Sequence, residues 1–463
     1  MAVFSIIQKS QLEGAHRLDA EYYQPEYLDC KKKIENFGYK NLGDLLEILT
    51  DYHANGSYEV LKRNVQISNE KNFTLMVRSV DLERGDFNTD VRYVTEKAFN
   101  FLKKTKISGN EIIIDKIGNT GATYLMPKLN RPVTLGMNLF MLRLKKEIDP
   151  EFLYVFLNSR LGKLAISQKI TGMNPTSIDK ASVRSIKIPI VPKDFSDNIS
   201  QLVKRVFVLE EESKKVYSQA ENLLLEELEL KKFKSENELW SVVNLSETKK
   251  ANRIDADYFQ PKYGEILEKI KNHNAIKIGD LADLVGHATQ SPYNEAGDIA
   301  VLAQTHMKHN MMIDTTTFSN YTKEDLIKKN DKKFILKKGD MLISSAGEPG
   351  LTNVWTGDYD GKVIPGSFVT LARIKKEIEP LYAGLFLNTP AGKLQFERYC
   401  TGSIQQYVYP VKIKDILIPI LPKPIQQKIA DLVQQSHEAR KEAKQLLEEA
   451  KNKVEEMIEN GTR

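Results

Sequence analysis

An internal duplication is the feature of this sequence that most constrains its fold. The stretch RLDAEYYQP at 17–25 returns as RIDADYFQP at 253–261, and KKEIDP at 145–150 returns as KKEIEP at 375–380. Shorter matches join 43–45 to 279–281, 156–158 to 386–388, 162–164 to 392–394, and 188–193 to 418–423. Similarity that recurs in one order along the whole chain predicts two tandem copies of one folded unit.

The two copies diverge in one window. The offset between them falls from 236 to 230 residues somewhere between about residues 50 and 109, where the copies share almost no sequence. A frame kept around a diverged window predicts a common scaffold that presents two different surfaces. A surface insert that has drifted without a task is the alternative.

Each copy mixes strand-like runs with helices, which predicts the α+β fold class. Short apolar runs bounded by turn residues predict strands at 111–114, 139–144, 341–343 and 368–371. Proline at the first position predicts helices at 150–164 and 380–394.

Each copy ends in a long helical pattern whose apolar residues alternate at spacings of four and three, which is typical of a coiled coil. The expected seam consists of Ile199, Leu202, Val206, Leu209, Val216 and Leu223 in the first copy, and Ile429, Leu432, Ala439, Leu446 and Met457 in the second. Solvated surface helices are the alternative, but two equal seams in one chain favour mutual pairing. Because the first helix delivers the chain to the second copy, its partner has to run back, and we expect an intramolecular antiparallel pair.

Charge and composition narrow the function classes. The helical stretches 193–234 and 423–463 hold 16 basic and 17 acidic residues, whereas the whole chain has a net charge of +5. The globular parts therefore carry about +6, a charge suited to a phosphate backbone. No apolar run is long enough for a membrane span, and no secretory signal is visible. Cys30 and Cys400 lack a C-x-x-C neighbour, so we expect a reducing, cytoplasmic setting.

The motifs of common enzyme classes are missing. The sequence has no G-x-x-x-x-G-K-[ST] phosphate loop and no G-x-S-x-G elbow, and Asn174-Pro175 continues with Thr176 rather than with a second proline. His306 and His309 are the one close histidine pair, and such a pair on a loop is more often surface than a metal site. These absences favour a chain without a catalytic site or a metal.

The whole chain resembles the specificity subunit of type I restriction-modification systems. The resemblance is carried by the R-x-D-A-x-Y-x-x-P openings at Arg17 and Arg253, the G-x-x-G turns at 118–121 and 347–350, the Thr-Gly loops at 171–172 and 401–402, and the Pro-rich entry to each long helix. Two departures are visible. The Gln pair after the helix entry is present as Gln426-Gln427 but missing from the first copy, and the basic residue before the turn is Lys116 in the first copy but Ser344-Ser345 in the second.

The resemblance implies a non-enzymatic subunit with target-recognition domains at 1–194 and 239–424 and helical regions at 195–238 and 425–463. Each domain would read one half of a split double-stranded DNA target. Helices of roughly 38 residues, about 57 Å long, would hold the two readers about a turn and a half of DNA apart. Two modification subunits would dock along the helices and restriction subunits would join them, and S-adenosylmethionine, Mg and ATP would belong to these partners.

Two other classes of function stay open on the residues alone. One is a coiled-coil scaffold whose globular ends bind proteins, and the other is a nuclease or methyltransferase with cryptic motifs.

Candidate DNA contacts fall in three places of each copy. In the first copy they are Lys116, Asn119 and Thr120 on the Gly-rich turn, Asn174, Thr176 and Ser177 after the Thr-Gly loop, and Lys62, Arg63 and Arg78 in the diverged window. In the second they are Ser344 and Ser345, then Ser403, Gln405, Gln406 and Tyr407, and His306, Lys308 and His309. Glycines let a backbone approach DNA closely, and amides pair bidentately with adenine. Plain tight turns and filler loops are the alternative. Arg17 and Arg253 lie in the shared frame, so we expect them to brace the fold.

Overall fold

The computed structural model describes residues 4–10, 12, 17–231, 233, 240–402 and 405–461. It divides into two compact units, unit 1 (Met1–Leu209 and Glu442–Arg463) and unit 2 (Glu210–Lys441). Each unit contains one copy of the repeat together with half of each long helix. No helix in the described part of the chain is long and apolar enough to cross a membrane.

The centre of unit 1 is an antiparallel sheet that is buried on both faces. Its order is β2 (Leu46–Asp51), β10 (Leu139–Leu144), β7 (Ile112–Asp115) and β8 (Thr123–Leu125). Ile112 and Leu142 join a core shared with helices, whereas Ile113 and Met141 join a second core under another sheet. This split follows from the two-residue period of a strand. The strand predictions at 111–114 and 139–144 are therefore confirmed to within a residue.

The diverged window of unit 1 supplies the second sheet. Its order is β3 (Ile67–Ser68), β5 (Arg92–Val94), β4 (Thr74–Val77), β9 (Val133–Leu135) and β6 (Lys106–Ile107), with β4 and β9 parallel. Three short helices accompany it: α3 (Tyr58–Asn64), α4 (Ser79–Arg84) and α5 (Glu96–Phe101). The remaining elements of the unit are α2 (Pro25–Phe37), α8 (Lys180–Arg184) and the ribbon of β1 (Tyr39–Asn41) with β11 (Lys187–Pro189).

Unit 2 repeats the central sheet in the same order: β13 (Ala282–Gly286), β19 (Val369–Ile374), β16 (Met341–Ser344) and β17 (Thr352–Val354). Unit 2 also keeps a parallel pair, in which β14 (Ile299–Leu302) from its diverged window pairs with β18 (Lys362–Pro365) after that window, and it adds β15 (Tyr321–Thr322). Short 3-10 turns stand where unit 1 has α3 to α5. The window thus retains a frame that sequence comparison does not reveal. Unit 2 also contains α10 (Leu245–Ala251), α11 (Pro261–Lys271), α12 (Ile278–Leu281), α15 (Pro410–Ile413) and the ribbon of β12 (Ile276–Lys277) with β20 (Leu417–Ile418).

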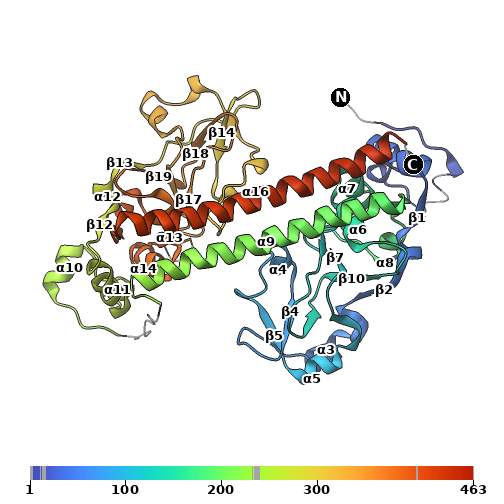
Figure 1. Ribbon diagram of the computed structural model, residues 1–463, viewed down its shortest axis with the longest axis horizontal. Helices are drawn as coiled ribbons and strands as arrows, with labels where there is room; N and C mark the ends of the chain where they lie inside the picture. The colour runs from blue at the N-terminus through green and yellow to red at the C-terminus, as the bar shows by residue number, and fades with distance from the viewer. Residues whose placement is uncertain are drawn as a thin grey trace. The chain divides into compact units, whose positions relative to one another are not determined.

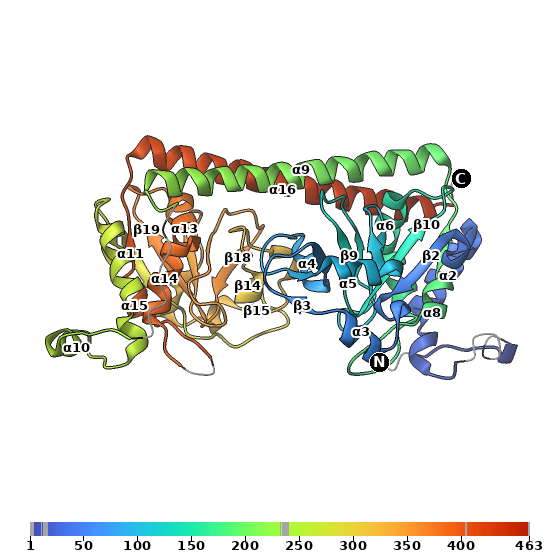
Figure 2. The ribbon, with the colours of Figure 1, turned by 90° about the horizontal axis from the view of Figure 1, so that it is seen from below.

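The single helix predicted after each proline is two helices. Unit 1 has α6 (Pro150–Asn158) and α7 (Arg160–Ser167), and unit 2 has α13 (Pro380–Asn388) and α14 (Pro390–Tyr399), seen beside β19 in Figure 2. The break residues Ser159 and Thr389 are N-caps, and their hydroxyls accept from the backbone N–H of Gly162 and Gly392. A Cβ on Gly162 would lie 1.9 Å from the Phe156 carbonyl oxygen, so only glycine permits this turn.

The two long helices, α9 (Lys193–Glu227) and α16 (Lys423–Glu459), pair in opposite chain directions within each unit (Figure 1). In unit 1 the start of α9 shares a core with the end of α16: Ile199 and Val203 lie in one cluster with Val454 and Ile458. In unit 2 the order is complementary, because Leu224 from the end of α9 lies in one core with Ile429 from the start of α16. The antiparallel prediction and the α+β class with two repeated domains are confirmed.

The predicted seam is correct in its period but not at every residue. Ile199, Val206, Leu209, Val216 and Ile429 are buried as expected. The other six, Leu202, Leu223, Leu432, Ala439, Leu446 and Met457, are only partly buried. Beside three of them a neighbour one position later is fully buried, as Val203, Leu224 and Val433 show. The reason is that each helix packs against its globular domain as well as against its partner, which widens the apolar stripe beyond a two-helix seam.

Helix α9 ends at Glu227, before the expected end of its region at 238. Glu229 has a left-handed φ of 55°, and the N–H of Leu230 donates to the Leu225 carbonyl at 2.8 Å. Leu230 and Leu225 also belong to one apolar cluster. These are the features of a Schellman helix end, built here without glycine.

The tight helix turn predicts a contrast between two glycines of unit 2. A Cβ on Gly392 would lie 2.4 Å from the Leu387 carbonyl oxygen, whereas a Cβ on Gly264 in α11 meets nothing within 4 Å. We expect Gly392→Ala to lower the free energy of unfolding by about 2 kcal/mol or more, and the matched Gly264→Ala to raise it by up to about 1 kcal/mol. Denaturant unfolding of both variants checks this, and equal effects of the two changes would contradict it.

Candidate nucleic-acid interface

Two loops that the sequence treats separately meet in unit 1. An isolated β-bridge from Ile117 to Ser177 joins the Gly-rich turn after β7 to the loop after Thr171, and a second, from Thr171 to Ser177, closes that loop on itself. The Ile178 N–H donates to the Lys116 carbonyl at 3.1 Å, and the Thr120 hydroxyl donates to the Thr176 carbonyl at 2.8 Å. The two sets of candidate residues therefore form one surface at the end of the central sheet, which we call junction 1.

Glycine at the end of the turn is required by conformation and by packing. Gly121 has a φ of 88°, and a Cβ there would lie 2.5 Å from Ile166 of α7. Gly350 of unit 2 has a φ of 93° and would place a Cβ 2.4 Å from Phe396 of α14. Both turns are thus held against a helix of the frame, while the residues between the glycines are free to vary.

Junction 1 is cationic. The Lys116 and Lys180 ammonium groups lie 3.1 Å and 3.0 Å from the two carboxylate oxygens of Asp51. Burial raises the pKa of Asp51, but the hydrogen bonds from Lys180 and Lys116 outweigh it and lower this pKa overall. The carboxylate is therefore ionised, and the two lysines around it leave this three-residue cluster with one positive charge.

A buried carboxyl group supports the base of the turn. Asp115 ends β7 with no exposed surface and accepts from the Ser79 hydroxyl at 2.6 Å. Burial raises the pKa of Asp115 to about 6, and the nearby charge of Glu83 adds to this, although hydrogen bonds from Ser79 and Tyr124 act the other way. This carboxyl group titrates near neutral pH, which its sequence context does not reveal.

The same backbone junction recurs in unit 2. Isolated β-bridges join Ala346 to Tyr407 and Thr401 to Tyr407, and the Val408 N–H donates to the Ser345 carbonyl at 2.8 Å. We call this surface junction 2. Its main-chain pattern matches junction 1, but its side chains do not. The duplicated sequence predicts such a common scaffold that presents different side chains in the two copies.

Three of the predicted contacts in unit 2, His306, Ser344 and Ser345, are buried. His306 is only 4% exposed. Its Nδ1 accepts a hydrogen bond from the Ala303 N–H at 2.9 Å, and its ring lies edge-on to the Phe318 ring. Ser344 and Ser345 are 1% and 0% exposed, and they hydrogen-bond Gln304 and Thr370. These groups position the turn and cannot reach a ligand in this arrangement.

The other candidates reach the surface to different degrees, and their roles stay predictions. Ser403 lies outside the described residues. The candidates that are exposed or half-exposed are Lys62, Arg63, Asn119, Thr120, Asn174, Thr176, Ser177, Lys308, His309, Gln405, Gln406 and Tyr407. Asn119 donates to Glu83 at 2.9 Å, and His309 lies 3.4 Å from Glu348. Arg78 pairs with buried Asp81 at 2.7 Å and so already has a structural partner.

Arg17 and Arg253 make matching local contacts in the two copies. Arg17 forms two hydrogen bonds with Asp19 and lies over the Tyr22 ring, and Arg253 does the same with Asp255 and Tyr258. Sequence reasoning missed Asp51 and Lys180, because only the fold brings them to the turn.

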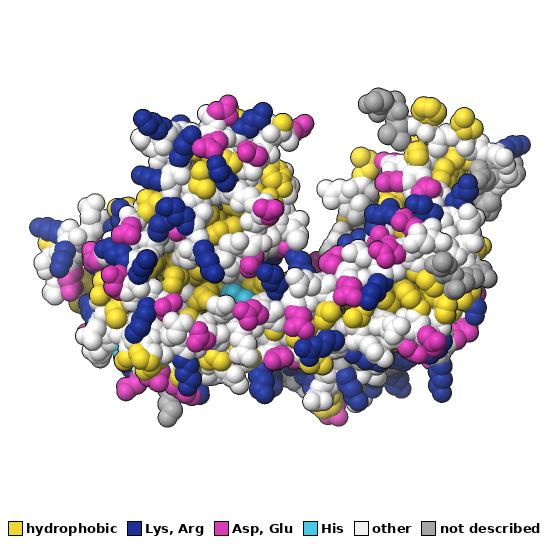
Figure 3. All heavy atoms as spheres, turned by 45° about the horizontal axis from the view of Figure 1, so that its top comes forward, with side chains coloured by type: hydrophobic (Ala, Val, Ile, Leu, Met, Phe, Trp, Pro, Cys, Tyr) yellow, Lys and Arg dark blue, Asp and Glu magenta, His cyan; other side chains and the backbone are white. Residues whose placement is uncertain are grey.

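On the face of unit 2 visible in Figure 3, lysine and arginine side chains are scattered among carboxylates instead of forming one field. This face of unit 2 therefore presents no broad positive field.

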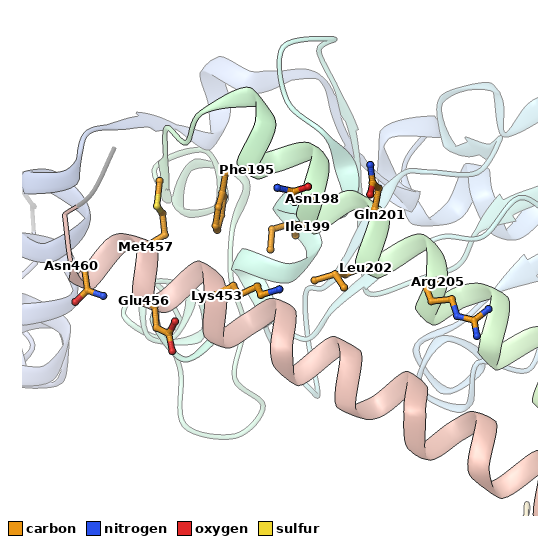
Figure 4. Close-up of a pocket in the computed structure, with 10 residues that line it drawn as sticks. All are labelled: Phe195, Asn198, Ile199, Gln201, Leu202, Arg205, Lys453, Glu456, Met457 and Asn460. Carbon is orange, nitrogen blue, oxygen red and sulfur yellow. The ribbon is translucent and has the colours of Figure 1, made fainter.

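A groove along the helix pair of unit 1 is a second candidate surface. Phe195, Ile199 and Leu202 of α9 line it with Met457 of α16 (Figure 4). The polar side chains around it are Asn198, Gln201, Arg205, Lys453, Glu456 and Asn460. An apolar floor with a polar rim has the composition of a protein–protein contact. Across the described ranges, no group of three or more His, Cys, Asp or Glu side chains is arranged to hold a metal ion.

Comparison with known proteins identifies the family. The model of the type I restriction modification DNA specificity domain matches residues 34–218 and again 270–452. The chain therefore belongs to the type I restriction-modification DNA specificity family, whose members recognise DNA targets, and it contains two of these domains.

Solved structures are similar to this chain at low sequence identity. The S subunit of the type I restriction-modification system of M. genitalium is 13% identical, with 92% of this chain and 95% of that chain covered and a TM-score of 0.38. The HsdS subunit of Thermoanaerobacter tengcongensis is also 13% identical, with 92% and 97% covered and a TM-score of 0.29. Comparison with curated protein sequences finds no match.

The raised pKa of Asp115 predicts a pH-dependent stability. Its folded value of about 6 exceeds the usual value of an unfolded aspartate, so the native state binds the proton more tightly, and stability from this group falls as pH rises through 6. We expect Asp115→Asn to gain stability relative to the unmodified chain between pH 4 and pH 7. Thermal unfolding of both proteins across that range checks this, and a constant difference would contradict it.

Proposed function

We propose that this chain reads a split double-stranded DNA target, with one half-site recognised by each unit. The observation that carries the proposal is the pair of junctions: the same main-chain hydrogen bonds hold two loops together in both units, while the side chains on those loops differ. Sequence is read by side chains at base edges, and a fixed backbone supplies the geometry. Two junctions with different side chains would read two different half-sites.

In unit 1 the contacts divide by chemistry. Lys62 and Arg63 are exposed in the last turn of α3, and the Asp51 cluster adds one positive charge at junction 1. Such groups suit phosphates and set the register on the duplex. Asn119 and Thr176 carry the hydrogen-bonding groups that suit base edges. In unit 2 the exposed amides of Gln405 and Gln406 would contact base edges.

The helices would carry the partner subunits. We propose that two modification subunits dock along α9 and α16, one of them at the groove of Phe195, Leu202 and Met457, and that restriction subunits join this complex in the cytoplasm. The division into recognition domains 1–194 and 239–424 and helical regions 195–238 and 425–463 is part of this proposal. Catalysis, with S-adenosylmethionine, Mg and ATP, would belong to the partners, and this chain would supply no catalytic group.

Half-site assignment tests the reading function. Methylation mapping in cells that hold this chain and its modification subunit defines the target. We expect Asn119→Ala with Thr120→Ala to relax methylation at one half-site, and the matched Gln405→Ala with Gln406→Ala to relax it at the other, because each pair belongs to one unit. Relaxation of the same half-site by both pairs would contradict one reader per unit. Failure of the complex to bind DNA at any salt concentration would favour a protein scaffold, and modification by the chain alone would favour an enzyme.

The length of the helix pair tests how the half-sites are spaced. Ser213 hydrogen-bonds Ser436 and Arg205 lies 3.3 Å from Glu442, so residues 204–210 and 439–445 are facing heptads. Removal of both shortens the pair by about 10 Å, or about three base pairs. We expect a shorter spacer between unchanged half-sites, measured by methylation mapping. Changed half-site letters would overturn the spacing role, and removal of one heptad alone is the control that should disrupt pairing.

A further inference from the structure

Three aromatic side chains form a row at junction 2, which we call the aromatic row. The Phe368 and Tyr407 rings lie 6.3 Å apart, and the Tyr407 and Tyr409 rings lie 4.8 Å apart, both edge to face. Phe368 is 53% exposed and Tyr409 is 55% exposed, so the row lies open at the surface. Such edge-to-face contacts hold rings in place, which makes the row a firm apolar edge.

The aromatic row replaces polar residues of junction 1. Backbone contacts identify the counterparts: Lys116 N–H donates to the Asn138 carbonyl and Ser345 N–H to the Phe368 carbonyl, both at 2.8 Å. By the same bridges and caps, Tyr407 stands in the place of Ser177, and Tyr409, which precedes α15, stands in the place of Asp179, which precedes α8. Three polar positions of one unit are thus aromatic in the other.

The surroundings of the row favour a polyanion over a protein. The segment 398–414 carries Arg398, Lys412 and Lys414 and not one aspartate or glutamate. Single exposed apolar residues are ordinary on protein surfaces, whereas a contiguous apolar patch often marks a binding site. The three rings form such a patch at the junction that we propose reads DNA. Lys412 lies in the short helix that follows Tyr409, and Glu348 of the facing turn is paired with Lys393 at 3.6 Å, so an apolar edge with a lysine beside it can approach a DNA groove between its phosphates.

We propose that the aromatic row contacts thymine methyl groups in the major groove of the half-site that unit 2 reads. The thymine C5-methyl is the apolar group that a base pair of unmodified DNA presents there, and aromatic side chains can bury it. Unit 2 thereby selects part of its half-site by shape and apolar contact, whereas unit 1 uses charge and hydrogen bonds. This inference rests on the proposed function, because it presumes that unit 2 reads DNA.

The test changes the DNA and leaves the protein intact. Duplexes with the mapped target receive uracil for thymine, one position at a time, which removes only the methyl group, and the complex with its modification subunit is titrated against each. We expect at least one substitution in the half-site of unit 2 to weaken binding roughly fourfold. The same substitution should leave the Phe368→Ala, Tyr409→Ala double variant unaffected, since its apolar contact is already lost.

Controls separate this inference from the proposed function. Uracil in the half-site of unit 1 should affect both proteins equally, and Tyr409→Phe, which keeps the ring, should retain the response to uracil. The double variant should also keep the salt dependence of binding. Lys116→Gln, in contrast, should reduce the slope of log binding constant against log salt concentration by about one, because a phosphate contact is removed. If uracil has no effect in the half-site of unit 2, or weakens the double variant as much as the unmodified protein, the aromatic row does not read methyl groups. If the unmodified complex shows no preference for the mapped target, the proposed function fails and the inference fails with it.

Discussion

The main-chain hydrogen bonds that join two loops at the end of each central sheet are the constraint on which the rest of this molecule depends. In unit 1 the Ile178 N–H donates to the Lys116 carbonyl, and in unit 2 the Val408 N–H donates to the Ser345 carbonyl. Backbone groups make these bonds whatever the side chains are. The side chains of the two loops can therefore differ while the frame stays the same: junction 1 carries the Lys116, Lys180 and Asp51 cluster, and junction 2 carries the aromatic row.

The frame under the junctions tolerates less change. Gly121 and Gly350 at the turns, and Gly162 and Gly392 at the start of α7 and α14, have no room for a Cβ. Equivalent ion pairs lie beside the central strands of both units: Arg143 donates one hydrogen bond to Glu111, and Arg373 donates two to Asp340. Loss of one partner from such a buried pair leaves a charge without compensation. These positions recur in both copies, at places where packing leaves little room for another residue.

The helix pair combines apolar packing with polar groups in unit 2. Ser213 and Ser436 are buried and hydrogen-bond each other at 2.8 Å, and burial raises the pKa of Glu210 and lowers that of Arg440 nearby. Polar groups in a helix seam cost stability but disfavour shifted registers, because a slip would leave them unpaired. Here they lie where the apolar stripe of α9 is interrupted, which is consistent with a pair that has one defined register.

The amino-acid sequence by itself determined the duplication, the α+β class, the strands predicted at 139–144 and 341–343 and the antiparallel helix pair, because these follow from the repeated sequence and from apolar periodicity. It also placed candidate contacts on the two loops that form each junction. Only the tertiary structure decided that these loops meet, that Asp51 and Lys180 join Lys116, and that His306, Ser344 and Ser345 are buried. The physical reason is that periodicity reports which face of an element is covered, whereas contacts between residues 60 to 130 positions apart depend on how those elements pack.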